Sequence, residues 1–290
     1  MKTNKVNKQK SVGQKVVYGI AFAYLCLHCL SLIYPLIWLI ISSFKDSYEY
    51  MIANPFALPE KFLFHNYVEA FELIKVRGTT FFGLLFNSIW WSVGNTFLNL
   101  FMSALVAYVM AKYDFGAHKY IYAIIIMIMV VPIYGSGASA YKLAVDLNII
   151  NSPLLLIKSL GGYSGFNFLV LFSFFKSIAW SYAEAAFMDG AGHFKVYLQV
   201  MLPMALAPVF SLALVVWIGI WNGYMEPLVY LYDYPTLATG LYVYEKDMTR
   251  AINYPVYFAG VTMCLAPVIT LFICSQDVIM NSISTGGLKG

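Results

Sequence analysis

Charged residues are scarce in this chain. Only 11% of its 290 residues are Asp, Glu, Lys or Arg, whereas 61% are hydrophobic and the mean hydropathy is +0.71. An ordinary globular domain has about 25% charged residues, so the composition excludes a soluble domain and predicts a membrane protein with several spans. The net charge of +4 does not indicate nucleic-acid binding, because five lysines precede the first apolar segment and form an orientation signal instead.

Cysteine and histidine are also few, with four of each. All four cysteines fall inside apolar segments, so no extracellular disulfide framework is expected. Cys26, His28 and Cys29 are close in sequence, but His28 points to a different side of a helix from its neighbours. We therefore expect neither a metal site nor a cofactor.

A phosphate-binding sequence of the form G-x-x-x-x-G-K-[ST] is missing. Gly161, Gly162 and Gly165 lie close together but lack the Lys and the Ser or Thr that such a loop needs. The apolar segments also lack the paired carboxylates or histidine clusters of an intramembrane enzyme, which is the less favoured alternative. The chain is therefore not expected to be an enzyme, and any ATP hydrolysis would take place on another subunit.

Long apolar runs dominate what is present, and they predict an all-α membrane protein with six transmembrane helices within residues 16–276. About 20 apolar residues cross a bilayer. The runs are 16–44, 78–111, 120–141, 159–175, 196–225 and 251–276. The fourth run reaches the required length only if it begins at Leu154 and the Lys158 side chain extends to the interface.

Prolines predict breaks in two of these helices. Pro132, together with Gly135–Gly137, predicts an interruption of the third helix, either a kink or a gate. Pro203 and Pro208 predict a kink near the start of the fifth helix.

Six spans place both termini on one side of the membrane. With the N-terminus inside, ten Lys and Arg residues lie on the inner side and seven on the outer side, while Lys158 is unassigned. The basic N-terminus 1–15 and the tail 277–290 are therefore expected in the cytoplasm. The segment 181–203 then lies on the cytoplasmic side as well.

This segment, SYAEAAFMDGAGHFKVYLQVMLP, is a polar interruption between the fourth and fifth runs. Ser181 and Glu184 have the spacing of a capping box, which predicts a helix that begins at Ser181. Its alanines offer a small-residue surface, and Gly190 supplies the left-handed conformation that ends a helix. Helical character resumes at His193. The sequence thus predicts a helix, a glycine elbow and a second helix.

The run E-A-A-x-x-D-G-A from Glu184 to Ala191, with Leu202-Pro203 after it, resembles the EAA loop of permease subunits in bacterial ATP-binding-cassette (ABC) importers. Trp221-Asn222 and the tail Gly286–Gly290 are similar to the smaller, maltose-type permease subunits of carbohydrate importers. The resemblance covers roughly residues 87–290. It implies the type I ABC importer permease fold in the bacterial plasma membrane. It also implies a second permease, two ATPase subunits, an extracellular solute-binding protein and a carbohydrate substrate of the oligosaccharide class.

The resemblance further implies that Glu184 to Gly192 form a coupling helix that contacts the ATPase. Glu184 would pair with a basic group there, the alanines would allow close packing, and Gly190 would set the elbow angle. The simpler alternative is that Glu184 only caps its own helix. The residues expected to couple to the ATPase are Glu184, Ala185, Ala186, Asp189, Gly190, Ala191, Gly192 and Pro203. The tail would also contact the ATPase.

Sugar contacts are harder to predict. Aromatic faces and hydrogen-bonding groups bind sugars, and the outer half of the fifth run offers Trp217, Trp221, Asn222 and Tyr224. A membrane-interface role is the alternative for the tryptophans, and in similar transporters the sugar site lies mainly on the partner permease. The loop 230–244 has the position from which similar subunits reach into the binding protein.

Two other functions remain as alternatives. An ABC-independent channel or secondary transporter would commonly show internal repeats and ionisable groups along its pathway, and neither is evident in this sequence. An ABC importer of a non-sugar solute is the second alternative, since the sequence does not name the substrate.

Overall fold

The computed structural model of this chain describes residues 12–131, 135–247 and 253–286, and these residues form helices with no β-strand. The chain divides into two units, one of residues 1–69 and 253–262 and the other of residues 70–252 and 263–290. Pro132, the N-terminal lysines up to Lys10, and the tail from residue 287 onward lie outside the described residues.

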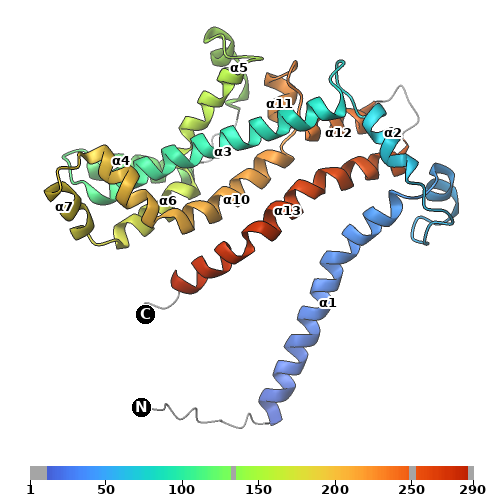
Figure 1. Cartoon of the computed structure of the whole chain (residues 1–290), viewed down its shortest axis with the longest axis horizontal. Coiled ribbons are helices and arrows are strands. Elements are labelled where there is room, and N and C mark those ends of the chain that lie inside the picture. Colours follow the sequence, from blue (N-terminus) through green and yellow to red (C-terminus); the bar gives the residue numbers. More distant parts are fainter. Residues whose placement is uncertain (1–11, 132–134, 248–252, 287–290) are drawn as a thin grey trace. The chain divides into compact units, whose positions relative to one another are not determined.

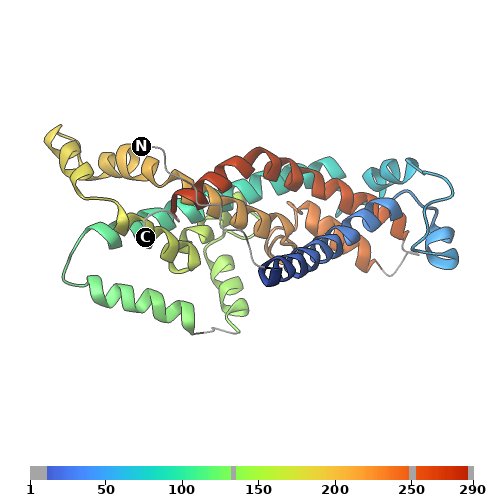
Figure 2. The same ribbon diagram turned by 90° about the horizontal axis from the view of Figure 1, so that it is seen from below.

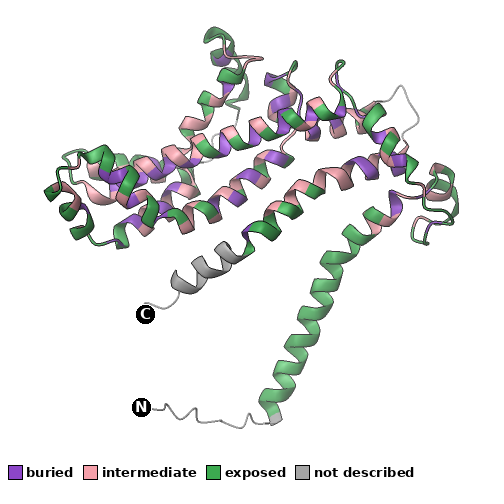
Figure 3. Ribbon diagram, in the orientation of Figure 1, coloured by how far each residue is buried: buried purple, intermediate pink, exposed green. Residues whose placement is uncertain are grey.

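The first unit contains α1 (Val12–Ser42), a single π-helical turn, η1 (Glu49–Ala53), and the start of α2 (His65–Leu73). Residues 13–37 of α1 are exposed on every side, although the helix is strongly apolar (Figure 3). A helix that is hydrophobic all round is typical of a membrane span. This element matches the first predicted span closely.

A buried lysine organises the loop after α1. Lys45 is fully buried, and its ammonium group donates to the carbonyl oxygens of Asn54 (2.9 Å) and Pro55 (3.0 Å). The Trp38 indole donates to the same Pro55 carbonyl (3.1 Å), and the Asn66 amide donates to the carbonyls of Ser43 and Lys45. The loop is therefore closed on itself by hydrogen bonds to its own backbone.

The second unit is built around α3 (Phe81–Lys112), which runs beside α6 (Phe166–Ser177) and α10 (Leu206–Asn222) (Figure 1, Figure 2). Their apolar faces form the main core, which includes Leu100, Phe168 and Leu212. The unit also contains α4 (His118–Val130), α5 (Gly137–Asp146), η2 (Pro153–Ser164), α11 (Met225–Tyr230), α12 (Leu237–Lys246) and most of α13 (Tyr254–Gly286).

The fourth predicted span is not one straight helix. Its first half, η2, is wound as a 3₁₀-helix, and it meets α6 at an angle of 55°. Lys158 forms an ion pair with Glu226, in the expected outer loop, and its ammonium group lies 4.0 Å from the ring centre of Tyr230; its position at the interface stays a prediction. Side chains of α3 bind both halves: Ser103 donates to the Gly162 carbonyl of η2 (3.1 Å), and Asn99 accepts from Asn167 of α6 (3.1 Å).

The two predicted proline breaks are present. The third span divides into α4, which ends at Val130, and α5, which begins at Gly137; the expected outer loop from residue 142 is helical as far as Asp146. The fifth span contains α8 (His193–Val196), η3 (Tyr197–Met201) and α9 (Leu202–Met204), and it bends by 78° before α10. Pro208 lies in the first turn of α10, where its missing N–H removes no helical hydrogen bond.

Three described helices are long and apolar enough to cross a membrane: Gly13–Ser42, Phe81–Lys112 and Tyr254–Gln276. The two bent pairs, within residues 153–177 and 193–222, could each be one more span. The remaining candidate, α4, is a shorter apolar helix of 13 residues. The helical membrane fold is confirmed, while the number of six spans stays a prediction.

Candidate functional site

The 181–203 segment begins with α7 (Ser181–Met188), but not through the predicted capping box. Ser181 lies inside the helix, and the N-cap position is Trp180, which makes no side-chain capping bond. Two amides, those of Ala183 (2.8 Å) and Glu184 (3.1 Å), donate to the Trp180 carbonyl. The capping-box prediction is therefore wrong, and the Glu184 carboxylate is free of that role.

The predicted glycine elbow is present. Gly190 has φ = +78°, in the left-handed region, directly after the last turn of α7. Its amide donates to the Phe187 carbonyl (2.9 Å), and the Ala191 amide donates to the Ala186 carbonyl (3.0 Å). These two bonds are the Schellman pattern of helix termination, so the direction of the chain after α7 is fixed.

The alanines of α7 divide between two faces. Ala183 is fully buried, and Ala186 and Ala191 pack against the main core. The opposite face exposes Tyr182, Glu184, Ala185 and Met188, and the Met188 side chain is 88% exposed. Tyr182, Ala185 and Met188 are three residues apart, so they form one continuous apolar strip with Glu184 beside it. Of the three alanines expected to form the small-residue surface, Ala183, Ala185 and Ala186, only Ala185 is exposed.

An aromatic cluster attaches this segment to the end of α3, and sequence reasoning missed it. The Tyr113 hydroxyl lies 2.9 Å from His193 Nδ1 and 3.2 Å from the Tyr108 hydroxyl. The His193 ring packs edge-on against Phe187 (4.9 Å between ring centres), and Trp180 packs edge-on against Tyr113 (5.6 Å). The Lys112 ammonium group also donates to the Ile178 carbonyl just before α7. The contacts of Lys112 and Tyr113 with this segment join residues 66 to 80 positions apart, and nothing in their spacing indicated the pairing.

The rest of the segment leads back into the core. Val196, Tyr197 and Met201 are buried, whereas Pro203 is exposed on α9 and lies outside the aromatic cluster. Gly192 has φ = −76°, which any residue adopts, so it has no elbow role of its own. The geometry thus concentrates on α7 and Gly190.

The four predicted sugar-contacting residues do not form one site. Trp217 and Trp221 stack 4.9 Å apart but are buried, and the Trp221 indole donates to the Cys264 carbonyl of α13 (3.2 Å). Asn222 is exposed at the end of α10, and Tyr224 stacks on Tyr242 (4.2 Å). Trp217 lines an almost wholly apolar cavity of about 850 Å³ between α3, α10 and α13. The two tryptophans therefore pack against neighbouring helices, and contact of the four residues with a sugar stays a prediction.

Hydrogen bonds from two sides fix the position of the 230–244 segment. Asn151 binds it from one side: the Asn151 amide N–H donates to the Tyr230 carbonyl (2.7 Å), and the side chain exchanges hydrogen bonds with Asp233. Asn87 of α3 donates to the Pro235 carbonyl (3.0 Å) from the other side. Insertion of this segment into a binding protein stays a prediction, but the segment is structured as expected. At the end of α12, the Lys246 ammonium donates a hydrogen bond to the Glu245 carboxylate (2.9 Å), which raises the pKa of Lys246.

No group of three or more His, Cys, Asp or Glu side chains among the described residues could hold a metal ion. The site thus consists of an exposed helix, a fixed elbow and an aromatic attachment to the longest helix of the second unit. This arrangement can receive a force from a bound protein and pass it to the core.

Residues 103–285, well over half of the chain, match the family described as "Binding-protein-dependent transport system inner membrane component". The chain belongs to this family. It is therefore the membrane-spanning permease subunit of an ABC importer that works with a solute-binding protein. Hydrolysis of ATP takes place on a separate subunit in this family.

Similar proteins match this chain over most of its length and of their own. The diacetylchitobiose uptake system permease protein NgcG of Streptomyces coelicolor is 29% identical and covers 93% of this chain and 89% of its own length. The arabinooligosaccharides transport system permease protein AraQ of Halalkalibacterium halodurans is 27% identical and covers 89% of this chain and 91% of its own. A chain of a bacterial ABC transporter that imports the acidic polysaccharide alginate has the same fold, with a TM-score of 0.77, 22% identity and 93% and 98% coverage.

Proposed function

We propose that this chain forms half of the translocation pathway of a carbohydrate importer, with an oligosaccharide as its substrate. A second permease, two ATPase subunits and an extracellular solute-binding protein complete the assembly. Both termini, residues 1–15 and 277–290, lie in the cytoplasm of a bacterial plasma membrane. The names of the two curated relatives, both oligosaccharide systems, support the substrate class.

The observation that carries the coupling role is the exposed strip of α7. Tyr182, Ala185 and Met188 face outward from a helix whose other face is packed into the core. An exposed apolar strip of this kind, on a subunit with few charged residues, marks a protein contact. Glu184 at its edge is available for a basic group of the ATPase, because it makes no capping bond.

The elbow and the aromatic cluster make the contact mechanically useful. A helix held by Gly190 at one end and by Trp180 and Tyr113 at the other moves as a body with α3. Closure of the two ATPase subunits would then shift α3 and the helices that pack on it, and alternate access between the two sides of the membrane. ATP that binds to the ATPase subunits would therefore move the helices of the translocation pathway, and this chain needs no nucleotide site of its own.

ATP-driven uptake of labelled oligosaccharides into vesicles that contain the reconstituted complex tests this proposal. We expect uptake with the wild-type chain and loss of uptake with Glu184→Lys, because the reversed charge repels the basic group on the ATPase. Glu72→Lys, an equally exposed glutamate on α2, serves as the matched control and is expected to transport normally.

Two results would contradict the proposal in different ways. Normal uptake by Glu184→Lys would remove the coupling role of α7. Uptake of amino acids or inorganic ions in place of any oligosaccharide would leave the coupling intact and replace the substrate class.

A further inference from the structure

A small cavity of about 210 Å³ lies between the 75–79 turn and the helices α11 and α12. Lys75, Arg77 and Tyr232 line it together with apolar side chains that include Val76 and Leu228. Among the described residues, no Asp or Glu lines this cavity. We refer to the cavity as the basic pocket; it belongs entirely to the second unit.

The turn that carries Arg77 has an unfavourable backbone for this residue. Arg77 (φ = +49°) and Gly78 (φ = +85°) both have left-handed conformations. Val76 and Thr79 close the turn with two hydrogen bonds, from Val76 N–H to Thr79 O (3.2 Å) and from Thr79 N–H to Val76 O (2.8 Å). Asn, Asp or Gly is favoured at the Arg77 position of such a turn. A residue held in an unfavourable backbone conformation suggests a function for its side chain.

The charges of the pocket are not neutralised within the described residues. Neither Lys75 nor Arg77 forms an ion pair there; the Arg77 guanidinium lies over the Tyr232 ring, 5.3 Å from its centre. The two acids nearest in sequence to Tyr232 and α11 are already engaged, since Glu226 pairs with Lys158 and Asp233 with Asn151. The pocket therefore offers two cations to an anionic group from outside the chain.

Hydrogen bonds and close packing attach one wall of the pocket to α3. Asn87 binds the Pro235 carbonyl, the Leu237 amide donates to Ser88 (2.7 Å), and Gly240 lies so close to Leu84 that a methyl group there would come within 2.5 Å of its side chain. A site that is formed before binding loses little conformational entropy when it is filled. The pocket is thus suited to receive a partner without rearrangement.

From these features we infer that the basic pocket binds a carboxylate side chain of the solute-binding protein. Sites for whole small molecules have volumes of about 300–1,000 Å³, so this pocket is too small for a sugar chain but large enough for one side chain. Its apolar walls suit the methylene stem of a glutamate, while Arg77 and Lys75 bind the carboxylate. The inference rests on the proposed function, which places this end of the second unit outside the cell.

Affinity measurements between the purified solute-binding protein and the complete transporter in lipid nanodiscs test this inference. The double reversal Lys75→Glu with Arg77→Glu is expected to weaken the affinity by about tenfold or more, mainly through slower association, and to reduce its salt dependence. Arg77→Asn removes one charge and suits the left-handed backbone better, so it keeps the turn folded and is expected to weaken binding by a smaller factor.

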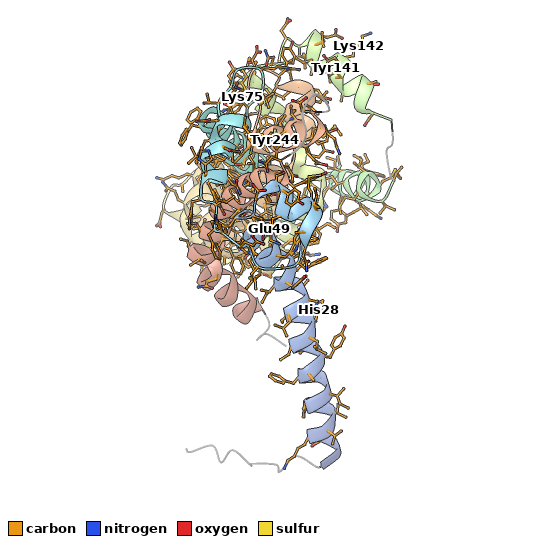
Figure 4. The ribbon with its side chains drawn as sticks, turned by 90° about the vertical axis from the view of Figure 1, so that its right-hand side faces the viewer. His28, Glu49, Lys75, Tyr141, Lys142 and Tyr244 are labelled. Atoms are coloured by element: carbon orange, nitrogen blue, oxygen red, sulfur yellow. The ribbon has the colours of Figure 1, made fainter. Side chains whose placement is uncertain are left out.

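Lys142 provides the matched control. It is an exposed lysine of α5 that does not line the pocket, and Figure 4 labels it together with Lys75. Lys142→Glu is expected to leave the affinity unchanged. A loss of affinity equal to that of the pocket variants would show a general charge effect and overturn the inference.

Other outcomes separate this inference from the proposed function. Unchanged affinity of the Lys75 and Arg77 variants overturns the pocket while the transporter still couples ATP hydrolysis to uptake. Unchanged affinity with a selective loss of uptake of acidic saccharides assigns the pocket to the substrate instead, and also overturns it. A wild-type complex that neither retains an ATPase nor responds to a solute-binding protein overturns both proposals.

Discussion

Gly190 determines the path of the chain after α7, because a left-handed φ and two closing hydrogen bonds meet at this residue. A side chain on a left-handed residue costs about 1–2 kcal/mol. The space around Gly190 is open, so this cost is conformational and not a clash. The elbow is therefore a property of the backbone that one methyl group can alter.

We predict that Gly190→Ala lowers the free energy of unfolding by about 1 kcal/mol and weakens retention of the ATPase by the complex during purification. Gly192→Ala is the control: Gly192 has φ = −76° and equally open surroundings, so it is expected to behave as wild type. Equal stability of the two variants would show that the elbow does not depend on the left-handed conformation.

Residue type alone predicted part of this site. Gly190 was recognisable, since few other residues adopt its conformation. The capping-box prediction failed because Trp180, and not Ser181, is the N-cap residue. Trp180 already has a helical backbone, and its ring contacts Tyr113 and Phe187. Such tertiary contacts decide between a cap and a helix, and the sequence contains no local signal for them.

At the scale of the element, η2 depends on its contact with α3. A methyl group on Gly162 would overlap the Asn99 amide, whereas one on the neighbouring Gly161 would meet nothing within 4 Å. The two glycines therefore differ in one respect that a substitution can isolate.

We predict that Gly162→Ala destabilises the second unit by about 1–3 kcal/mol, because the added methyl separates η2 from α3. Gly161→Ala is expected to change the stability by well under half as much. Thermal unfolding of the purified complex, with hydrogen exchange of residues 153–164, measures both. Greater disturbance by Gly161→Ala would show that η2 does not pack on α3 through Gly162.

The same scale shows which elements a hydrophobic pattern can predict. Spans one, two and six were visible as uninterrupted runs, and each is a single long helix. Span four was not, since its 3₁₀ half is bound by Ser103 of a distant helix. Prolines located the bend of span five, but the π-helical turn Tyr197–Met201 had no signal in the sequence.

At the scale of the whole molecule, a single chain leaves much apolar surface uncovered. Most of α1 is exposed on all sides, and the strip of α7 and the cavity beside Trp217 are lined by apolar side chains. Surfaces of this size are covered by lipid or by other proteins. The composition predicted that a single chain would leave apolar surface uncovered. The identity of the proteins that cover it depends on other chains, which this sequence does not encode.

The coupling role of α7 is the central claim, and site-directed cross-linking tests it most directly. Met188, at 88% exposure, would be replaced by Cys in a chain whose four native cysteines are replaced by Ser, and the assembled transporter would be treated with a short bifunctional thiol reagent. We expect a cross-link between this chain and the ATPase subunit with Met188→Cys and none with Ala183→Cys, since Ala183 is fully buried. Absence of an ATPase from the purified complex, or cross-linking of Met188→Cys only to a second copy of this chain, would contradict the account.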